Sequence, residues 1–229
     1  IQSIDRKMDL EDIARALGVS KSTVSKALNG APDVSDAMRT AALEKAVELG
    51  YTLPNRRSAA RRLALFITNM ACETPDDFGY EIVVGFRKMA EPAGYQVDVI
   101  PLDRKMQETY HYDAYMVSNR YLGGLFLGIS LLDPWIEEFK TCKTPTVLYD
   151  NHIRENPHVA QVAVDCYEGI HLAISHLKAL GHQKIGYLSS ALQAYVYQQR
   201  YHAFFRAMDD CGLPGSQSLS GSASHISDC

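Results

Sequence analysis

Two short segments near the start of the chain, residues 10–17 and 21–28, restrict its fold more than any other feature. Leu10, Ile13, Ala14 and Leu17 recur at the spacing of one helical face in the first segment. Gly18 then ends this helix, because glycine readily adopts the left-handed conformation of a sharp C-terminal turn. Two short helices separated by three residues predict a helix-turn-helix.

The second of these helices is apolar on one face and polar on the other. Ser20 can cap it, and its buried face holds Val24, Ala27 and Leu28. The polar face presents Lys21, Ser22, Ser25 and Lys26, and a third helix is expected at 36–49. In DNA-binding proteins such a face enters the major groove, where hydroxyls and lysines contact phosphates and base edges. From spacing alone, a three-helix bundle without a role in DNA binding remains an alternative.

Charge is distributed unevenly along the chain. The net charge is −4 over 229 residues, but residues 1–62 hold eleven basic and eight acidic residues, which is +3. The remaining 12 basic and 19 acidic residues give −7. A basic head on an acidic body is typical of a protein that contacts nucleic acid at one end.

From residue 63 onward, short apolar runs alternate with amphipathic stretches. This alternation indicates βαβ units and a parallel sheet, which binds ligands at the carboxyl ends of its strands. The expected strands are 63–68, 95–100, 123–129, 146–149, 162–164 and 184–188. The expected helices are 80–93, 104–121, 134–140, 169–180 and 197–211.

The last sixteen residues and the cysteines complete this outline. Residues 214–229 are rich in Ser and Gly without periodicity and are predicted to be disordered. The five cysteines have no metal-ligand spacing and fit a reduced intracellular protein. We find no signal peptide and no apolar run long enough to span a membrane.

The string from Met8 to Gly30, MDLEDIARALGVSKSTVSKALNG, resembles the LacI/GalR family of bacterial repressors, as does LGYTLPN at 49–55. The resemblance implies that Lys21, Ser22 and Lys26 read bases. It implies that Ser20, Thr23, Ser25 and Asn29 anchor phosphates.

The hinge that follows departs from the family pattern. Asn55 is followed by a basic stretch in which Arg56, Arg57, Arg61 and Arg62 would neutralise phosphates. The family usually inserts a leucine into the minor groove here, but that position holds Arg61 unless Leu63 takes the role. The resemblance therefore implies a hinge that contacts DNA without establishing that it kinks the duplex.

The body also resembles this family, which carries a periplasmic-binding-protein-like effector domain. The matching segments include VDCYEG at 164–169 and HLKALGHQKIG at 176–186. Arg200 falls at the effector-binding arginine of the family, and its planar guanidinium suits a sugar or a carboxylate. Asp150 could accept hydrogen bonds from sugar hydroxyls, and Phe78 and Tyr80 could stack on a sugar ring.

These features predict an α + α/β chain: a three-helix DNA-binding head followed by a parallel-sheet effector domain. The expected divisions are a head at 1–55, a basic hinge at 56–63, an effector domain at 64–213 and a tail at 214–229. The 167 residues after position 62 are fewer than the family's effector domain needs, so we expect a truncated second subdomain.

The function predicted is a cytoplasmic transcription regulator, by family habit a repressor. Its expected partners are a near-palindromic operator in double-stranded DNA, a sugar-like effector and a second copy of the chain, without a membrane, cofactor or metal. The alternative is a sugar-binding protein without operator-specific DNA binding. No nucleophile elbow, P-loop or metalloprotease motif predicts an enzyme.

Overall fold

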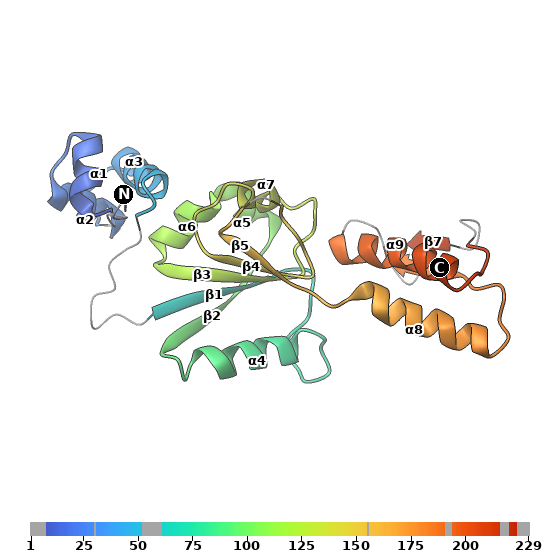
Figure 1. The fold of residues 1–229 in the computed structure, drawn as a ribbon. Helices are drawn as coiled ribbons and strands as arrows, with labels where there is room; N and C mark the ends of the chain where they lie inside the picture. The colour runs from blue at the N-terminus through green and yellow to red at the C-terminus, as the bar shows by residue number, and fades with distance from the viewer. Residues whose placement is uncertain are drawn as a thin grey trace, which may run out of the picture.

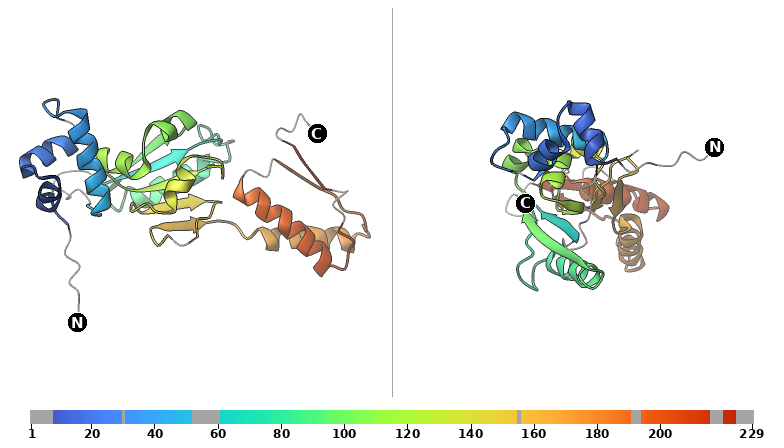
Figure 2. Two further views of the ribbon diagram at one scale, coloured as in Figure 1. Left: turned by 90° about the horizontal axis from the view of Figure 1, so that it is seen from above. Right: turned by 90° about the vertical axis from the view of Figure 1, so that its left-hand side faces the viewer.

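The computed structural model describes residues 8–29, 31–51, 61–154, 156–190, 194–215 and 220–223. Three parts follow one another along the long axis of the molecule in both lengthwise views (Figure 1 and Figure 2). They are a helical head, a subdomain built on a five-stranded sheet, and a smaller second subdomain. None of the helices within these ranges is long and apolar enough to cross a membrane.

The head consists of α1 (Leu10–Leu17), α2 (Lys21–Leu28) and α3 (Asp36–Glu48). Asp9 caps α1 in a capping box with Asp12, and Gly18 ends the helix at φ 65°. Ser20 accepts a hydrogen bond from the backbone N–H of Thr23 at the start of α2. The three helices share one core, formed by the buried side chains of Ile13, Ala14, Val24, Ala27, Leu28, Ala42, Ala46 and Tyr51.

The first subdomain is a parallel sheet with strand order β2-β1-β3-β4-β5. Its strands are β1 (Arg61–Ile67), β2 (Tyr95–Pro101), β3 (Tyr121–Leu127), β4 (Thr146–Tyr149) and β5 (Val159–Val162). Helix α4 (Tyr80–Ala90) covers one face (Figure 1). The other face carries α5 (Arg104–Thr109), α6 (Tyr112–Ser118) and α7 (Trp135–Phe139). The strand order reverses direction between β1 and β3, where such sheets open a crevice for ligands.

Alternate residues of β1 and β3 point to opposite faces of this sheet. Phe66 and Phe126 stack on one face with ring centroids 4.6 Å apart, and Trp135 packs edge-on against Phe66. Leu65 and Leu127 pack on the opposite face, toward α4. Both faces of the sheet are therefore dry, as expected for a parallel sheet between helical layers.

The second subdomain contains α8 (Cys166–Ala179), β6 (Tyr187–Ser190), α9 (Tyr195–Asp210) and β7 (Ser220–Ala223). Its core is small and combines buried residues of α8 and α9 with Ile185. Strands β6 and β7 pair in parallel as a two-stranded sheet. Several large apolar side chains in and near this subdomain are more than half exposed, namely Val162, Val164, Leu172, Leu180 and Leu188.

The overall class, a helical head followed by a parallel α/β body, is as predicted, but several elements differ. The expected helix at 104–121 is two helices, because the chain is extended at Tyr110 and His111. The expected strands at 162–164 and 184–188 are displaced to Val159–Val162 and Tyr187–Ser190. The prediction of disorder throughout 214–229 is wrong for Ser220–Ala223, which forms β7 through backbone pairing that needs no large side chains.

The predicted hinge at 56–63 also requires correction at its C-terminal end. Strand β1 begins at Arg61, two residues before the expected start. The Arg62 guanidinium donates to Asp98 and to the carbonyl of Asn119, and Arg61 lies 3.9 Å over the Tyr95 ring. These contacts extend the strand, so Arg61 belongs to the sheet and not to a linker.

Candidate nucleic-acid interface and ligand pocket

Helix α2 presents an exposed polar face that its own folding leaves open. Lys21, Ser22 and Lys26 are exposed, whereas Val24 and Leu28 are buried on the opposite side. The head core holds that apolar side, and Ser20 fixes the first turn of the helix. The predicted base-reading residues therefore share one accessible surface of a rigidly held helix.

The residues expected to anchor phosphates flank this surface. Ser20 Oγ and Thr23 Oγ1 are 2.8 Å apart at the start of α2. At its end, the side-chain amide of Asn29 donates to the carbonyl of Ser25 over 2.6 Å. Ser20 and Asn29 are exposed, and Thr23 and Ser25 are half-buried. Their hydrogen bonds set the orientation in which these groups would meet a sugar-phosphate backbone.

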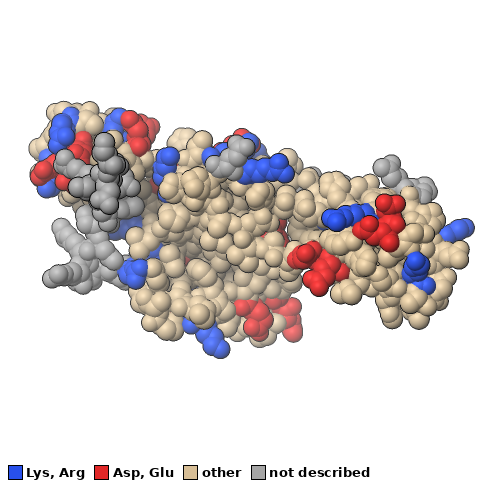
Figure 3. All heavy atoms as spheres, viewed as in Figure 1, with Lys and Arg blue, Asp and Glu red and all other residues tan. Residues whose placement is uncertain are grey.

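Both lysines of this face form ion pairs within the head. Lys21 Nζ lies 2.9 Å from Glu11 and Lys26 Nζ 2.5 Å from Asp33. The hydrogen bond from Lys26 lowers the pKa of Asp33, and that from Lys21 to Glu11 raises the pKa of Lys21. All four side chains are more than half exposed, so the pairs stabilise the head little and can be exchanged for phosphates. Basic and acidic side chains lie beside one another on the visible face of the head (Figure 3).

The hinge residues predicted to contact DNA separate into two groups. Asn55, Arg56 and Arg57 lie outside the described residues. Arg61 is the first residue of β1, where its guanidinium packs on Tyr95, and this position corrects its assignment to a hinge. The interface that the structure supports is therefore the exposed face of α2 with its flanking residues.

A pocket of about 310 Å³ lies between the two subdomains. One wall comes from the carboxyl ends of β4 and β5, including Asp150 and Gln161. The other comes from the N-terminal parts of α8 and α9, including Tyr167 and Gln199. The complete lining is Asp150, Gln161, Ala163, Val164, Asp165, Cys166, Tyr167, Tyr195, Val196, Gln199, His202, Ala203 and Arg206.

Asp150 carries an unmet hydrogen-bonding capacity in this pocket. Its backbone adopts φ 54°, a conformation that side-chain-bearing residues rarely take, and its N–H donates to the carbonyl of Val162. Its Oδ1 is buried and has no hydrogen-bond partner among the described residues. Burial raises the pKa of the carboxyl group, which the Val164 N–H and the charge of Arg200 partly offset. A buried acceptor of this kind calls for a ligand that donates to it.

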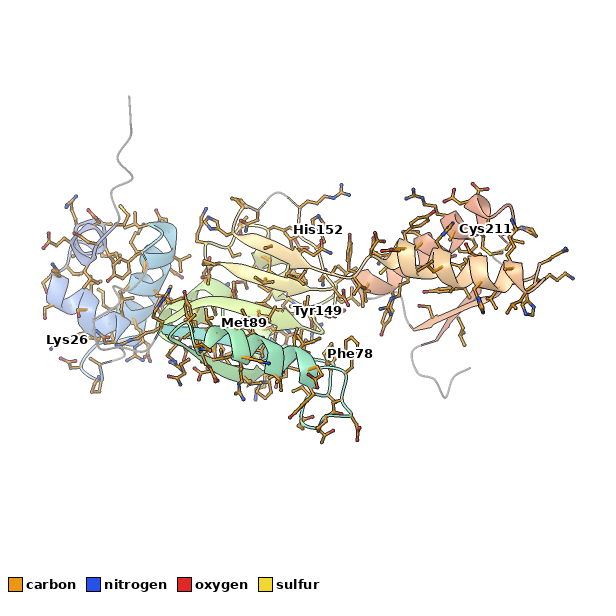
Figure 4. All side chains as sticks on the ribbon, turned by 60° about the horizontal axis from the view of Figure 1, so that its bottom comes forward. Lys26, Phe78, Met89, Tyr149, His152 and Cys211 are labelled. Carbon is orange, nitrogen blue, oxygen red and sulfur yellow. The ribbon has the colours of Figure 1, made fainter. Side chains whose placement is uncertain are left out.

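The other predicted effector residues do not line the pocket as directly as Asp150. Arg200 lies close enough to influence the pKa values of Asp150 and Tyr149, and it sits 5.9 Å over the Tyr197 ring. Phe78 is 68% exposed and lies at the sheet end that faces the second subdomain, as do Tyr149 and His152 (Figure 4). Tyr80 begins α4 on the opposite side of the switch point from Asp150.

Sequence reasoning missed most of the α9 wall. Tyr195, Gln199, His202 and Arg206 are spaced by four, three and four residues, so they share one face of that helix. This polar and aromatic periodicity was a usable signal. Tyr195 also approaches His152 at 6.0 Å between ring centroids, and this contact joins the two subdomains at the pocket.

Comparison with known proteins connects the head and the body to one family. Residues 9–55 match the family described as bacterial regulatory proteins, lacI family. Catabolite control protein A of Priestia megaterium is 26% identical over 206 residues, 89% of this chain. A cellobiose complex of the transcriptional regulator CelR has a TM-score of 0.61 at 23% identity, covering 97% of this chain and 67% of that one.

A further solved structure is the lac repressor dimer bound to operator and the anti-inducer ONPF. It has a TM-score of 0.53 at 21% identity and covers 95% of this chain and 66% of that chain. The chain spans 61% of the length of the Priestia relative. The match at the head, together with similarity that continues through the body, places this chain in the LacI family of bacterial regulatory proteins.

Proposed function

We propose that this chain is a sequence-specific DNA-binding transcription regulator, a repressor by the habit of its relatives, controlled by a small-molecule effector. The carrying observation is the pairing of an exposed polar recognition helix with a pocket around a buried acceptor oxygen. We further propose that it acts in the bacterial cytoplasm and binds its effector without chemical turnover. Relatives named as transcription regulators support these points.

The proposed DNA partner is a near-palindromic operator bound by a homodimer. Lys21, Ser22 and Lys26 enter the major groove, and Ser20, Thr23, Ser25 and Asn29 contact the flanking phosphates. A two-fold dimer requires two half-sites spaced by the DNA helical repeat so that both recognition helices face the same side. The lac repressor, bound to its operator as a dimer, supports this arrangement.

The proposed effector is a sugar or a related hydroxyl-rich metabolite. Asp150 accepts from ligand hydroxyls, Arg200 donates to the ligand from α9, and Phe78 and Tyr80 stack on it from the opposite side of the cleft. The cellobiose in the related CelR complex supports a carbohydrate. Ligand binding that closes the cleft alters the affinity for DNA, and operator DNA must alter the affinity for ligand by the same factor.

The DNA-binding proposal is tested by fluorescence-anisotropy titration of a palindromic family-type operator and a scrambled duplex at two salt concentrations. We expect the operator to bind more tightly, and Lys26→Ala to remove about 1–3 kcal/mol of this preference. Lys140→Ala on α7, which removes an equally exposed lysine from an ion pair in the body, is the matched control. Equal and salt-sensitive binding to both duplexes would contradict the proposal.

The effector proposal is tested by calorimetric titration with cellobiose and a panel of mono- and disaccharides. We expect Asp150→Asn and Arg200→Ala to abolish the heat of binding, whereas Glu137→Gln, at an exposed position on α7, leaves it unchanged. Sugar binding without any operator preference would instead favour a sugar-binding protein that does not read DNA.

A further inference from the structure

The DNA-reading head is packed against the body and not held apart from it. Val117 of α6 contacts the buried cluster of the head. Helices α3 and α6 lie side by side in Figure 1 and in the view from above in Figure 2. An apolar contact between two parts joined through residues 52–60 indicates a defined docked arrangement of the head.

A polar contact accompanies this packing at the end of the recognition helix. Arg120 follows α6 with φ 60°, and its guanidinium donates to the side-chain oxygen of Asn29. The same Asn29 caps α2 and donates through its amide to Ser25. Both functional groups of the Asn29 side chain are therefore engaged while the head is docked.

Docking and DNA binding make competing demands on this end of α2. In the proposed function Asn29 contacts a phosphate, so a duplex must approach the helix end that Arg120 and α6 now occupy. Contact with phosphate would require Asn29 to exchange its present partners, and the duplex backbone would meet α6. The two arrangements then exclude each other, and the fraction of undocked heads scales the apparent DNA affinity.

We propose that the docked head is an autoinhibited conformation, in which α6 and Arg120 cover the Asn29 end of α2, and that operator binding requires its release. This inference rests on the proposed function and adds an intramolecular competitor to it. It identifies Val117 and Arg120 as regulatory residues of the body that oppose DNA binding. Arg120 is the more diagnostic of the two, because removing a positive charge ordinarily weakens binding to DNA.

The first test measures operator affinity of the complete chain by fluorescence anisotropy at one salt concentration. We expect Arg120→Gln and Val117→Ser each to tighten binding about threefold to tenfold by raising the undocked fraction. Arg104→Gln on α5 is the matched control, since it removes an exposed arginine that pairs with Glu108 away from the head. The control should bind equally to or slightly more weakly than the parent chain.

The second test reads the docking contact directly. Val117→Cys should react slowly with a maleimide in the free protein and faster after addition of operator duplex, as measured by mass spectrometry of the peptide that contains it. Ser118→Cys, the next residue of α6 and exposed in the docked arrangement, should react equally fast in both states. Combining Val117→Cys with Arg120→Gln should accelerate labelling without any DNA.

The outcomes separate this inference from the proposed function. Operator preference in the parent chain with no tightening in either variant, or with Val117→Cys labelling that ignores the duplex, overturns the autoinhibited conformation alone. Weaker binding by Arg120→Gln identifies Arg120 as a DNA contact and also overturns it. Equal binding of operator and scrambled duplex by the parent chain and both variants overturns the proposed function and this inference together.

Discussion

The two subdomains of the body are built from the same strand–helix units, but they bury their sheets to different extents. In the first, the five strands have helical cover on both faces and aromatic packing around Trp135. In the second, the described part has two paired strands, a small core and half-exposed leucines such as Leu172 and Leu188. Buried apolar area is the main source of stability, so the two should differ widely in their free energy of unfolding.

This difference has a consequence for the pocket between the subdomains. Asp150 stands on the stable sheet, whereas Tyr195 and Gln199 stand on a helix of the less stable unit. Local opening of a weakly packed unit costs less free energy than global unfolding. A ligand that bridges both walls would therefore stabilise mainly the second subdomain, by mass action on its folded state.

The largest effect should come from the core of the first subdomain. Trp135 is fully buried, lies 5.3 Å from the Tyr112 ring between centroids, and donates through Nε1 to the carbonyl of Tyr110. Trp135→Ala should lower the free energy of unfolding by about 3–5 kcal/mol in urea denaturation followed by circular dichroism. Leu132→Ala, at an exposed position three residues earlier, should change it by less than about 0.5 kcal/mol.

A comparable cavity in the second subdomain should act only there. Met208 is fully buried in the core between α8 and α9, and Met208→Ala should cost about 2–4 kcal/mol of local stability. Trp135 is the single tryptophan and reports on the first subdomain, so its fluorescence transition in urea should not move. Hydrogen exchange of α9 amides should accelerate instead. A shift of the Trp135 transition by the full amount would show that the subdomains unfold as one unit.

The head was the most predictable part of the chain because its determinants are local. The stripe of α1, the cap at Ser20 and the turn at Gly18 each depend on residues within one or two helical turns. The predicted strands 95–100 and 146–149 also lie within one residue of β2 and β4. Short apolar runs between helices suffice to place buried parallel strands.

The features that sequence reasoning missed depend on distant contacts. The break between α5 and α6 is fixed by Glu138, which accepts from the backbone N–H of Tyr112 over 2.7 Å, and by the Trp135 bond to Tyr110. These partners lie about 25 residues along the chain, so no local pattern indicates the break. The pocket likewise joins Asp150 to Gln199 across two subdomains, and only the fold brings them together.

A smaller effect is expected where the first subdomain joins its sheet by polar contacts. Arg62 donates to Asp98 and to the carbonyl of Asn119, and both charged side chains are partly buried. Although burial opposes the shift, the hydrogen bond and charge of Arg62 lower the pKa of Asp98. Arg62→Ala should cost about 1–2 kcal/mol at neutral pH, after allowance for solvent screening.

The pH dependence of that loss gives its sign. A carboxyl group with a lowered pKa in the folded state stabilises the fold above its unfolded pKa, and this contribution disappears as pH falls through the folded value. The difference between the parent chain and Arg62→Ala in urea denaturation should therefore shrink below about pH 4. Arg104→Ala, which breaks an exposed pair with Glu108, should show no such dependence. A constant difference down to acid pH would mean that Arg62 acts through packing on Tyr121 alone.

The smallest effect should come from the exposed leucine of β6. Leu188 is 66% exposed, so Leu188→Ser removes little buried area and should change the stability of the second subdomain by less than about 0.5 kcal/mol. Hydrogen exchange of the α8 and α9 amides measures this change, and Leu132→Ser, 63% exposed in the first subdomain before substitution, is the control. If Leu188→Ser instead cost more than about 1 kcal/mol, this face of β6 would have to be buried in solution. The contrast between a covered and an open subdomain would then fail, because the second sheet would also have apolar cover.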